Sequence, residues 1–321
     1  MKIALVGAGY WGINLLRVLN ELNVLSIVCD SDAGVLKNVS QLHPELRTTS
    51  NLEETLSSDV DAVVVATPAK THFEIARKAI EAGKDVFVEK PLALSLHEAE
   101  KLKDLSSDRK RILMVGHILR YHPAVEKLKE LIADGKLGRI NYIYSNRLNF
   151  GKLRVEENIL WSFAPHDISI IQFLVGSNPD HVEARGASFL QSNIEDSTIT
   201  YLSYPGNIHA HIFVSWLHPF KEQRLVVIGD KGMMVFEDSA AKEKLKFYPK
   251  SFNNVNGTIQ KLDGEFEVIS HDDKQPLAEE QNHFVKCITE NRRPLTDGRH
   301  ALEVLKILKR AERSLKKVKS E

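Results

Sequence analysis

Cysteine is nearly absent from this chain of 321 residues: Cys29 and Cys287 are its only two, far apart and without metal-ligand spacing. The sequence therefore supports neither a disulfide framework nor a zinc ribbon. Net charge is absent as well, since 43 basic side chains balance 43 acidic ones. This balance removes the extended positive surface on which sequence-independent nucleic-acid binding depends. Nucleic acid is therefore not an expected partner.

Long apolar runs are missing too. No stretch approaches the roughly 20 apolar residues that a membrane span requires, and the first residues are strand-like rather than a charged leader with a cleavage site. We therefore expect no membrane partner and a cytoplasmic location. With 43% hydrophobic and 27% charged residues, a chain of this length can bury more than one core, which predicts two domains.

The order of apolar and amphipathic segments predicts an α/β fold with a boundary near residue 118. In 1–118, short apolar runs alternate with helix-period segments, which is typical of a doubly wound parallel sheet covered on both faces. These runs are KIALVG, VLSIVCD, VDAVVVATP, KDVFVEKP and RILMVGH. The remainder, 119–321, has alternating strands, a hairpin turn at Gly229–Gly232 and two closing amphipathic helices near 276–291 and 298–317. It is expected to form an α+β domain with a mostly antiparallel sheet.

A glycine-rich turn follows the first predicted strand. The segment VGAGYWG places Gly7, Gly9 and Gly12 between that strand and a helix. In a Rossmann turn the first glycine permits the tight bend, the second lets a pyrophosphate approach the backbone, and the third lets helix and strand pack closely. The helix N-terminus then faces the phosphates. We predict a dinucleotide site here, with an ordinary turn as the alternative. The remaining residues of this turn are Ala8, Tyr10 and Trp11.

Asp30 ends the second predicted strand. An acidic side chain at this place accepts hydrogen bonds from the adenosine ribose hydroxyls and repels a 2′-phosphate. The following Ser31 and Asp32 bring no arginine to pair with such a phosphate, so the segment favours NAD over NADP. Alternatively, Asp30 starts a turn or caps the next helix.

The run DVFVEKP ends in Glu89, Lys90 and Pro91 at the edge of the sheet where ligands bind, outside the carboxyl ends of the strands. We predict that Lys90 points toward the reactive end of the cofactor and that Glu89 orients it. Pro91 removes a backbone donor and stiffens the turn, and a cis bond before it would aim the lysine. The alternative is a surface lysine paired with a carboxylate.

Five motifs together resemble the Gfo/Idh/MocA family of nicotinamide-dependent oxidoreductases, and the resemblance spans essentially the whole chain. They are VGAGYWG, ATPAKTH, VFVEKPLA, VGHILRYHPAV and RPLTDGRHALEVLKIL. In that family the matching lysine touches nicotinamide and substrate, which implies a catalytic role for Lys90. The match of ATPAKTH implies that Thr67, Pro68 and His72 lie along the cofactor. For His72, a structural hydrogen bond at a helix start is the alternative.

The segment LWSFAPHDISIIQFL resembles the active-site helix of that family, on which an Asp and, four residues later, a His face the substrate. The histidine matches His166, which the resemblance implies for proton transfer, with a buried structural histidine as the alternative. The Asp position is Ser162 here, so the chain departs from the family pattern. Asp167 lies about 100° round the helix from His166 and could contact substrate or stabilise its domain.

Further side chains are predicted to contact the substrate, with packing as the alternative for each. They are Arg120, Tyr121, Arg147, Asn149 and Trp161. Arginines could clamp a diphosphate, and an aromatic ring could stack on a base or sugar.

The resemblance of ENILWSFAPHDISI to members of bacterial surface-sugar pathways implies an NAD-dependent oxidoreductase acting on a secondary alcohol of a sugar. A nucleotide-linked sugar of the UDP-N-acetylhexosamine type, oxidised at C3, is favoured. A free-sugar or inositol dehydrogenase and a non-catalytic NAD-binding sensor are the alternatives.

Two further expectations concern metals and assembly. A metal role for His209 and His211, two residues apart on one strand face, is not expected, because no third ligand is evident. An antiparallel sheet usually leaves one face that needs cover, so we expect a homodimer or homotetramer formed through the second domain.

Overall fold

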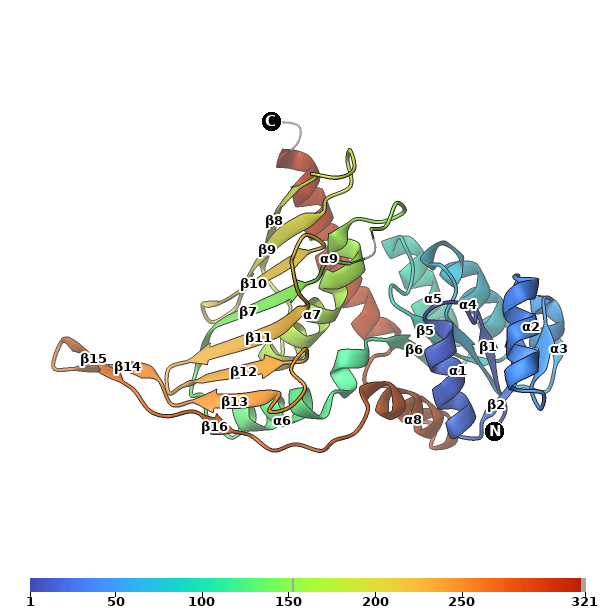
Figure 1. Cartoon of the computed structure of the whole chain (residues 1–321), viewed down its shortest axis with the longest axis horizontal. Coiled ribbons are helices and arrows are strands. Elements are labelled where there is room, and N and C mark those ends of the chain that lie inside the picture. Colours follow the sequence, from blue (N-terminus) through green and yellow to red (C-terminus); the bar gives the residue numbers. More distant parts are fainter. Residues whose placement is uncertain (152, 319–321) are drawn as a thin grey trace. The chain divides into compact units, whose positions relative to one another are not determined.

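The computed structural model describes residues 1–151 and 153–318. The chain forms two compact units (Figure 1), which are Met1–Ile118 with Gln275–Leu305 and Leu119–Lys274 with Lys306–Glu321. The division at residue 118 matches the sequence analysis. The segment Gln275–Leu305, however, belongs to the first unit, whereas the sequence analysis assigned all of 119–321 to the second domain.

The first unit contains a parallel sheet of six strands in the order β3-β2-β1-β4-β5-β6, counted over its described residues. The strands are β1 (Ile3–Val6), β2 (Leu25–Cys29), β3 (Arg47–Thr49), β4 (Ala62–Val65), β5 (Asp85–Glu89) and β6 (Leu113–Gly116). The central strands β1 and β4 are buried at every position, as expected of a sheet covered on both faces. This order is that of a Rossmann domain, which confirms the predicted fold.

Helices of the first unit begin and end where local signals place them. Ser95 accepts the backbone N–H of Glu98 at the start of α5, and Gly83 follows α4 with a φ of +76°. The helices are α1 (Gly12–Glu21), α2 (Ala33–Leu42), α3 (Leu52–Ser57), η1 (Ala69–Thr71), α4 (His72–Glu81), α5 (Leu96–Asp108), α8 (Pro276–Thr289) and the first part of α9 (Gly298–Val318). The ring of Phe284 on α8 lies 5.8 Å from that of Phe87 on β5, which shows why this helix belongs to the first unit.

The second unit contains a mixed sheet with the order β16-β13-β12-β11-β7-β10-β9-β8, as far as its residues are described. Its strands are β7 (Ile140–Leu148), β8 (His181–Ala187), β9 (Ser197–Tyr204), β10 (Ile208–Ser215), β11 (Glu222–Gly229), β12 (Met233–Glu237), β13 (Leu245–Tyr248) and β16 (Glu267–Val268). Neighbours pair antiparallel except β7 with β10, which confirms a mostly antiparallel sheet. Gly229 donates to the carbonyl of Gly232 in the predicted hairpin turn.

One face of this sheet is covered by helix α7 (Ile159–Val175), which packs on β7, β9 and β10. The unit also contains η2 (Ile118–Tyr121) from Leu119 onward and α6 (Pro123–Ala133). A separate hairpin of β14 (Ser251–Val255) and β15 (Thr258–Leu262) extends away from the sheet (Figure 1). In 1–151 and 153–318, no helix is both long and apolar enough to span a membrane.

Candidate active site

The glycine turn between β1 and α1 has the geometry of a phosphate cradle. Gly7 has a φ of +93°, and a Cβ there would lie 2.8 Å from the backbone of Ala66. A Cβ on Gly12 would lie 2.1 Å from the carbonyl oxygen of Gly7, so only glycine lets helix and strand pack this closely. A Cβ on Gly9 would meet nothing within 4 Å, which leaves space above the backbone. The residues present therefore fit a dinucleotide pyrophosphate.

Asp30 holds this turn in place. Its carboxylate accepts the backbone N–H of Ala8 at 2.7 Å through one oxygen and that of Asp32 at 2.9 Å through the other. Asp32 caps α2, so the alternative that Asp30 caps this helix is wrong. Each carboxylate oxygen of Asp30 keeps a lone pair that can accept a hydrogen bond from a ribose hydroxyl. Ser31, the next residue, is exposed. Ribose binding by Asp30 and Ser31 stays a prediction.

His72 ties two loops of the predicted site together. Its ring is buried, with Nδ1 2.7 Å from the carbonyl oxygen of Pro91 and Nε2 2.8 Å from that of Thr67. Burial lowers the pKa of His72 below its ordinary value, against the raising effect of these two carbonyls. This is the structural role that the sequence left open. Cofactor contacts of His72, Thr67 and the exposed Pro68 stay predictions.

The Glu89–Lys90 turn is attached to the glycine turn by a hydrogen bond. The indole Nε1–H of Trp11 donates to Glu89 Oε1 at 2.6 Å, and the backbone N–H of Lys90 donates to Glu89 Oε2 at 3.2 Å. A Cβ on Gly116 of β6 would lie 2.9 Å from that carboxylate, so glycine leaves room for it. Burial raises the pKa of Glu89 to about 7, while the indole and Lys90 oppose this rise. The bond between Lys90 and Pro91 is cis.

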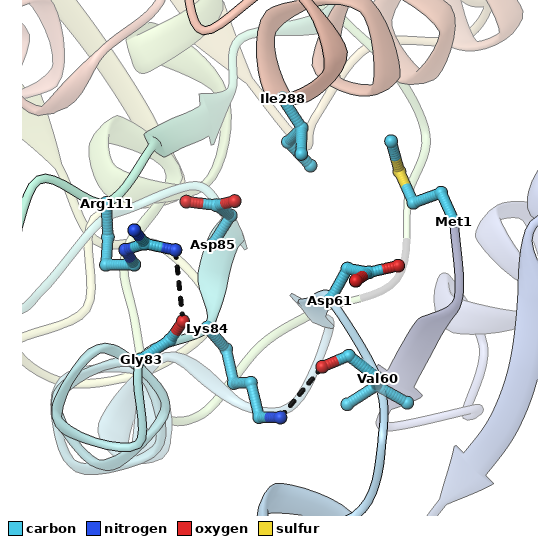
Figure 2. Close-up of a pocket in the computed structure, with 8 residues that line it drawn as sticks. All are labelled: Met1, Val60, Asp61, Gly83, Lys84, Asp85, Arg111 and Ile288. Carbon is cyan, nitrogen blue, oxygen red and sulfur yellow. Dashed lines mark hydrogen bonds between the residues drawn. The ribbon is translucent and has the colours of Figure 1, made fainter.

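A cavity of about 370 Å³ lies at the opposite edge of the same sheet (Figure 2). Its lining residues are Met1, Val60, Asp61, Gly83, Lys84, Asp85, Arg111 and Ile288. They precede or begin β1, β4, β5 and β6, or belong to α8, and Lys84 Nζ donates to the carbonyl of Val60 at 2.8 Å. Since the glycine turn and Lys90 follow the carboxyl ends of strands, this cavity is not part of the cofactor site.

Helix α7 of the second unit carries His166. Asn158 caps the helix by accepting the backbone N–H of Trp161 at 3.2 Å, and Gly176 ends it with a φ of +82°. His166 is half-buried, and Ser162, one turn earlier, is 3% exposed. Because a serine hydroxyl is not ionised, the negative charge of the family pattern is missing at this position.

Asp167 and Arg147, both predicted as substrate contacts, bind each other. The Asp167 carboxylate accepts Arg147 Nε–H at 2.8 Å, Arg147 Nη2–H at 3.2 Å and the hydroxyl of Ser145 at 2.5 Å. Asp167 is 1% and Arg147 7% exposed, so this pair connects α7 with β7 inside the core. Of the two roles left open for Asp167, the structure shows the stabilising one, and a substrate contact of either residue stays a prediction.

The remaining substrate candidates differ in exposure. Arg120 is buried with its guanidinium carbon 3.2 Å from the ring centre of Phe173, and burial lowers its pKa to about 10. Tyr121 is buried as well, and the buried indole of Trp161 donates to Glu312 at 3.2 Å. These contacts match the packing role, whereas Asn149 is only half-buried.

The two predicted catalytic side chains belong to different units: Lys90 to the first and His166 to the second. Their meeting at one substrate stays a prediction. His209 and His211 instead contact tyrosine hydroxyls, each through Nδ1, at 2.8 and 2.9 Å. In the part of the chain that the structure describes, no three His, Cys, Asp or Glu side chains are grouped to hold a metal ion.

Comparison with known proteins identifies both units. Residues 1–117 match the model of the Gfo/Idh/MocA oxidoreductase family, NAD-binding Rossmann fold, and residues 125–235 match the model of the Gfo/Idh/MocA C-terminal domain. An uncharacterised oxidoreductase of Streptococcus pneumoniae is 32% identical over 265 residues, which cover 77% of this chain and 71% of that protein.

Two characterised relatives are more distant. UDP-N-acetylglucosamine 3-dehydrogenase of Acidithiobacillus ferrooxidans is 26% identical over 93% of this chain and 92% of its own. Its solved structure superposes with a TM-score of 0.86 at 23% identity, covering 98% of this chain and 97% of that one, which shows a shared fold. scyllo-Inositol 2-dehydrogenase of Bacillus subtilis is 25% identical over 74% of this chain and 70% of its own.

Proposed function

Because this chain belongs to the Gfo/Idh/MocA family of oxidoreductases, whose Rossmann domain binds NAD, we propose that it moves a hydride between NAD and a secondary alcohol of a sugar. The observation that carries this proposal is the hydrogen bond from Trp11 to Glu89, which holds the Lys90 turn beside the glycine cradle. This attachment of the Lys90 turn to the glycine turn supports a position of the Lys90 ammonium beside the bound cofactor.

The proposed substrate is a nucleotide-linked sugar of the UDP-N-acetylhexosamine type, oxidised at C3. The likeness to UDP-N-acetylglucosamine 3-dehydrogenase extends over nearly the full length of both chains, whereas the likeness to the inositol dehydrogenase covers about three quarters of this one. Full-length similarity supports a shared substrate class better than similarity of one part, because the substrate-binding residues are expected in the second unit.

In the proposed mechanism, each catalytic side chain has a separate task. Bound NAD supplies the hydride acceptor at its nicotinamide C4. His166 removes the hydroxyl proton, since an imidazole with an ordinary pKa of about 6.5 suits a base near neutral pH. The Lys90 ammonium stabilises the alkoxide that develops and polarises the ketone in the reverse direction. With Ser162 in place of an aspartate, the residue one turn before His166 on α7 is uncharged.

A turnover assay with NAD and a matched substrate panel tests the proposal. We expect NADH absorbance to rise with UDP-N-acetylglucosamine and not with free N-acetylglucosamine, because the uridine diphosphate adds binding contacts. NADH formation with inositol or a free sugar alone would favour the polyol alternative. NAD binding without product from any alcohol in the panel would contradict the dehydrogenase and favour the sensor.

We also propose that the chain forms a homodimer or homotetramer through the face of its second sheet opposite α7. That face has apolar and aromatic side chains with partial exposure, which are Tyr142, Tyr144, Ile199, Tyr201, Phe213 and Ile228. Such a contiguous patch usually marks an interface. Light scattering should therefore give at least twice the chain mass of 36.2 kDa, and Ile199→Asp should reduce it to the monomer. A monomeric wild type would contradict this assembly.

A further inference from the structure

Glu280 on α8 is a carboxyl inside the core of the first unit, and it belongs to none of the predicted site residues. It is 0% exposed, and neither of its carboxyl oxygens has a hydrogen-bond partner among the described residues. An ionised carboxylate in such surroundings would be very costly, so the group keeps a proton instead. Burial, followed by the charge of Glu89, raises the pKa of Glu280 well above its ordinary value.

The packing of α8 on β5 places Glu280 near Glu89. Phe87 and Glu89 are two residues apart on β5 and therefore share one face of the strand, while Glu280 and Phe284 are one turn apart on α8. The rings of Phe87 and Phe284 lie 5.8 Å apart, so the faces that carry the two carboxyls are packed on each other. The half-buried Glu89 and the fully buried Glu280 thus lie on packed faces behind the Lys90 turn.

The two carboxyls have unequal surroundings. Glu89 accepts hydrogen bonds from the Trp11 indole and the Lys90 backbone, both of which stabilise its ionised form. The carboxyl oxygens of Glu280 have no donor within hydrogen-bond geometry among the described residues, and only the neighbouring side chain of Gln281 acts against the rise in its pKa. The neighbouring elements carry other charged or titratable groups, which are Lys90, Arg17 on α1 and His117 after β6. The Arg17 guanidinium donates to Glu21 and Gln275, and the ring of His117 packs edge-on against that of His300. When the pair carries one negative charge, that charge belongs on Glu89 and the proton on Glu280.

We propose that Glu89 and Glu280 form one proton-exchanging pair, with Glu280 as its positioning residue, and that binding of oxidised NAD expels a proton from this pair. This inference rests on the proposed placement of the nicotinamide ring beside Lys90. The oxidised ring is positively charged and favours the ionised pair, whereas the reduced ring is neutral and does not. One O–H bond breaks, the electron pair stays on the carboxylate, and the proton passes to buffer.

Calorimetric titration in two buffers of different ionisation enthalpy counts the protons released. Because burial raises the pKa of Glu89 to about 7, we expect about half a proton to be released at neutral pH when NAD⁺ binds, and clearly less when NADH binds. In Glu280→Gln, the amide cannot exchange a proton, and only Glu89 of the pair is left to titrate. The release should therefore shrink.

The matched control is Glu279→Gln, which removes a half-buried carboxyl from the preceding position of the same helix. This variant should keep the wild-type proton count. Equal counts for NAD⁺ and NADH in the wild type, or a wild-type count in Glu280→Gln, would overturn the inference. Because the readout is binding rather than turnover, a failure to oxidise any sugar would contradict the proposed function and leave the proton-exchanging pair standing.

Thermal unfolding provides a second readout that does not involve the cofactor. The pKa of Glu280 in the folded protein is raised above the ordinary value of about 4.3 for a glutamate. The folded state therefore binds this proton more tightly than the unfolded state, and the free energy of unfolding decreases as the pH rises above that ordinary value. The melting temperature of Glu280→Gln should therefore exceed that of the wild type by more at about pH 8 than at about pH 5. A difference that does not grow with pH would show that Glu280 is ionised in the folded protein, and would overturn the pair.

Discussion

Replacing Lys90 by methionine is expected to lower the rate of sugar oxidation by at least about 100-fold, the low end for a positioned acid, base or charge. Methionine keeps much of the length of the side chain and removes the ammonium that stabilises the developing alkoxide. The affinity for NAD should stay unchanged, because the pyrophosphate is predicted to bind the Gly7–Gly12 turn and the ribose to bind Asp30. Steady-state turnover and fluorescence titration with NAD measure the two quantities separately.

Lys101→Met is the matched control for this prediction, because Lys101 is an exposed lysine of α5 in the same unit. It should keep wild-type turnover and wild-type NAD affinity. Turnover by Lys90→Met at the wild-type rate would remove the ammonium from the mechanism. A parallel loss of NAD affinity and turnover would instead assign Lys90 to cofactor binding without a role in the hydride step.

The strands of the first unit were predictable because a parallel sheet buried on both faces needs continuous apolar runs, and β1 and β4 have them at every position. Strand β3 has no such run: Arg47–Thr49 is a polar segment at the sheet edge with no buried position. The return of Gln275–Leu305 to the first unit was not predictable either. The apolar stripe of α8 shows that the helix covers a core, but not which of two cores it covers.

The buried pair of Arg147 and Asp167 had a signal in the sequence. Arg147 is predicted as a substrate contact from its residue type, although the alternation along a strand also indicates which face of the sheet a side chain occupies. Ile143, Ser145 and Arg147 alternate with more exposed neighbours along β7, so Arg147 shares the buried face of Ile143. A core-facing arginine requires a carboxylate partner, and Asp167 on the packed face of α7 provides it.

Glu280 also left a signal in the sequence that the motif analysis did not use. Leu277, Glu280, Phe284 and Cys287 follow helical spacing, and all four are buried. A glutamate on an apolar stripe of a helix is expected to need a partner or a proton. The contact of Trp11 with Glu89 had no such signal, because the two residues are far apart in the chain and meet only when β1 and β5 lie in one sheet.

Asp167→Asn is expected to destabilise the second unit by about 3–5 kcal/mol, because it leaves the charge of Arg147 buried without its counter-ion. This is a large part of the roughly 5–15 kcal/mol that separates a folded domain from its unfolded state. Urea unfolding followed by tryptophan fluorescence measures it, since Trp161 and Trp216 lie in this unit. The double variant Asp167→Leu with Arg147→Met should recover most of the loss, because no unpaired charge remains.

The matched control is Glu183→Gln, which breaks the exposed ion pair with Arg185 on β8 and should cost no more than about 1 kcal/mol. Because Asp167 follows His166 on α7, the same variants also decide between its two roles. If Asp167 only holds the helix on β7, turnover by Asp167→Asn should follow the folded fraction, and the double variant should regain activity together with stability. If Asp167 contacts the sugar, both variants should be inactive at temperatures where each is fully folded. Wild-type stability of Asp167→Asn would contradict the buried ion pair itself.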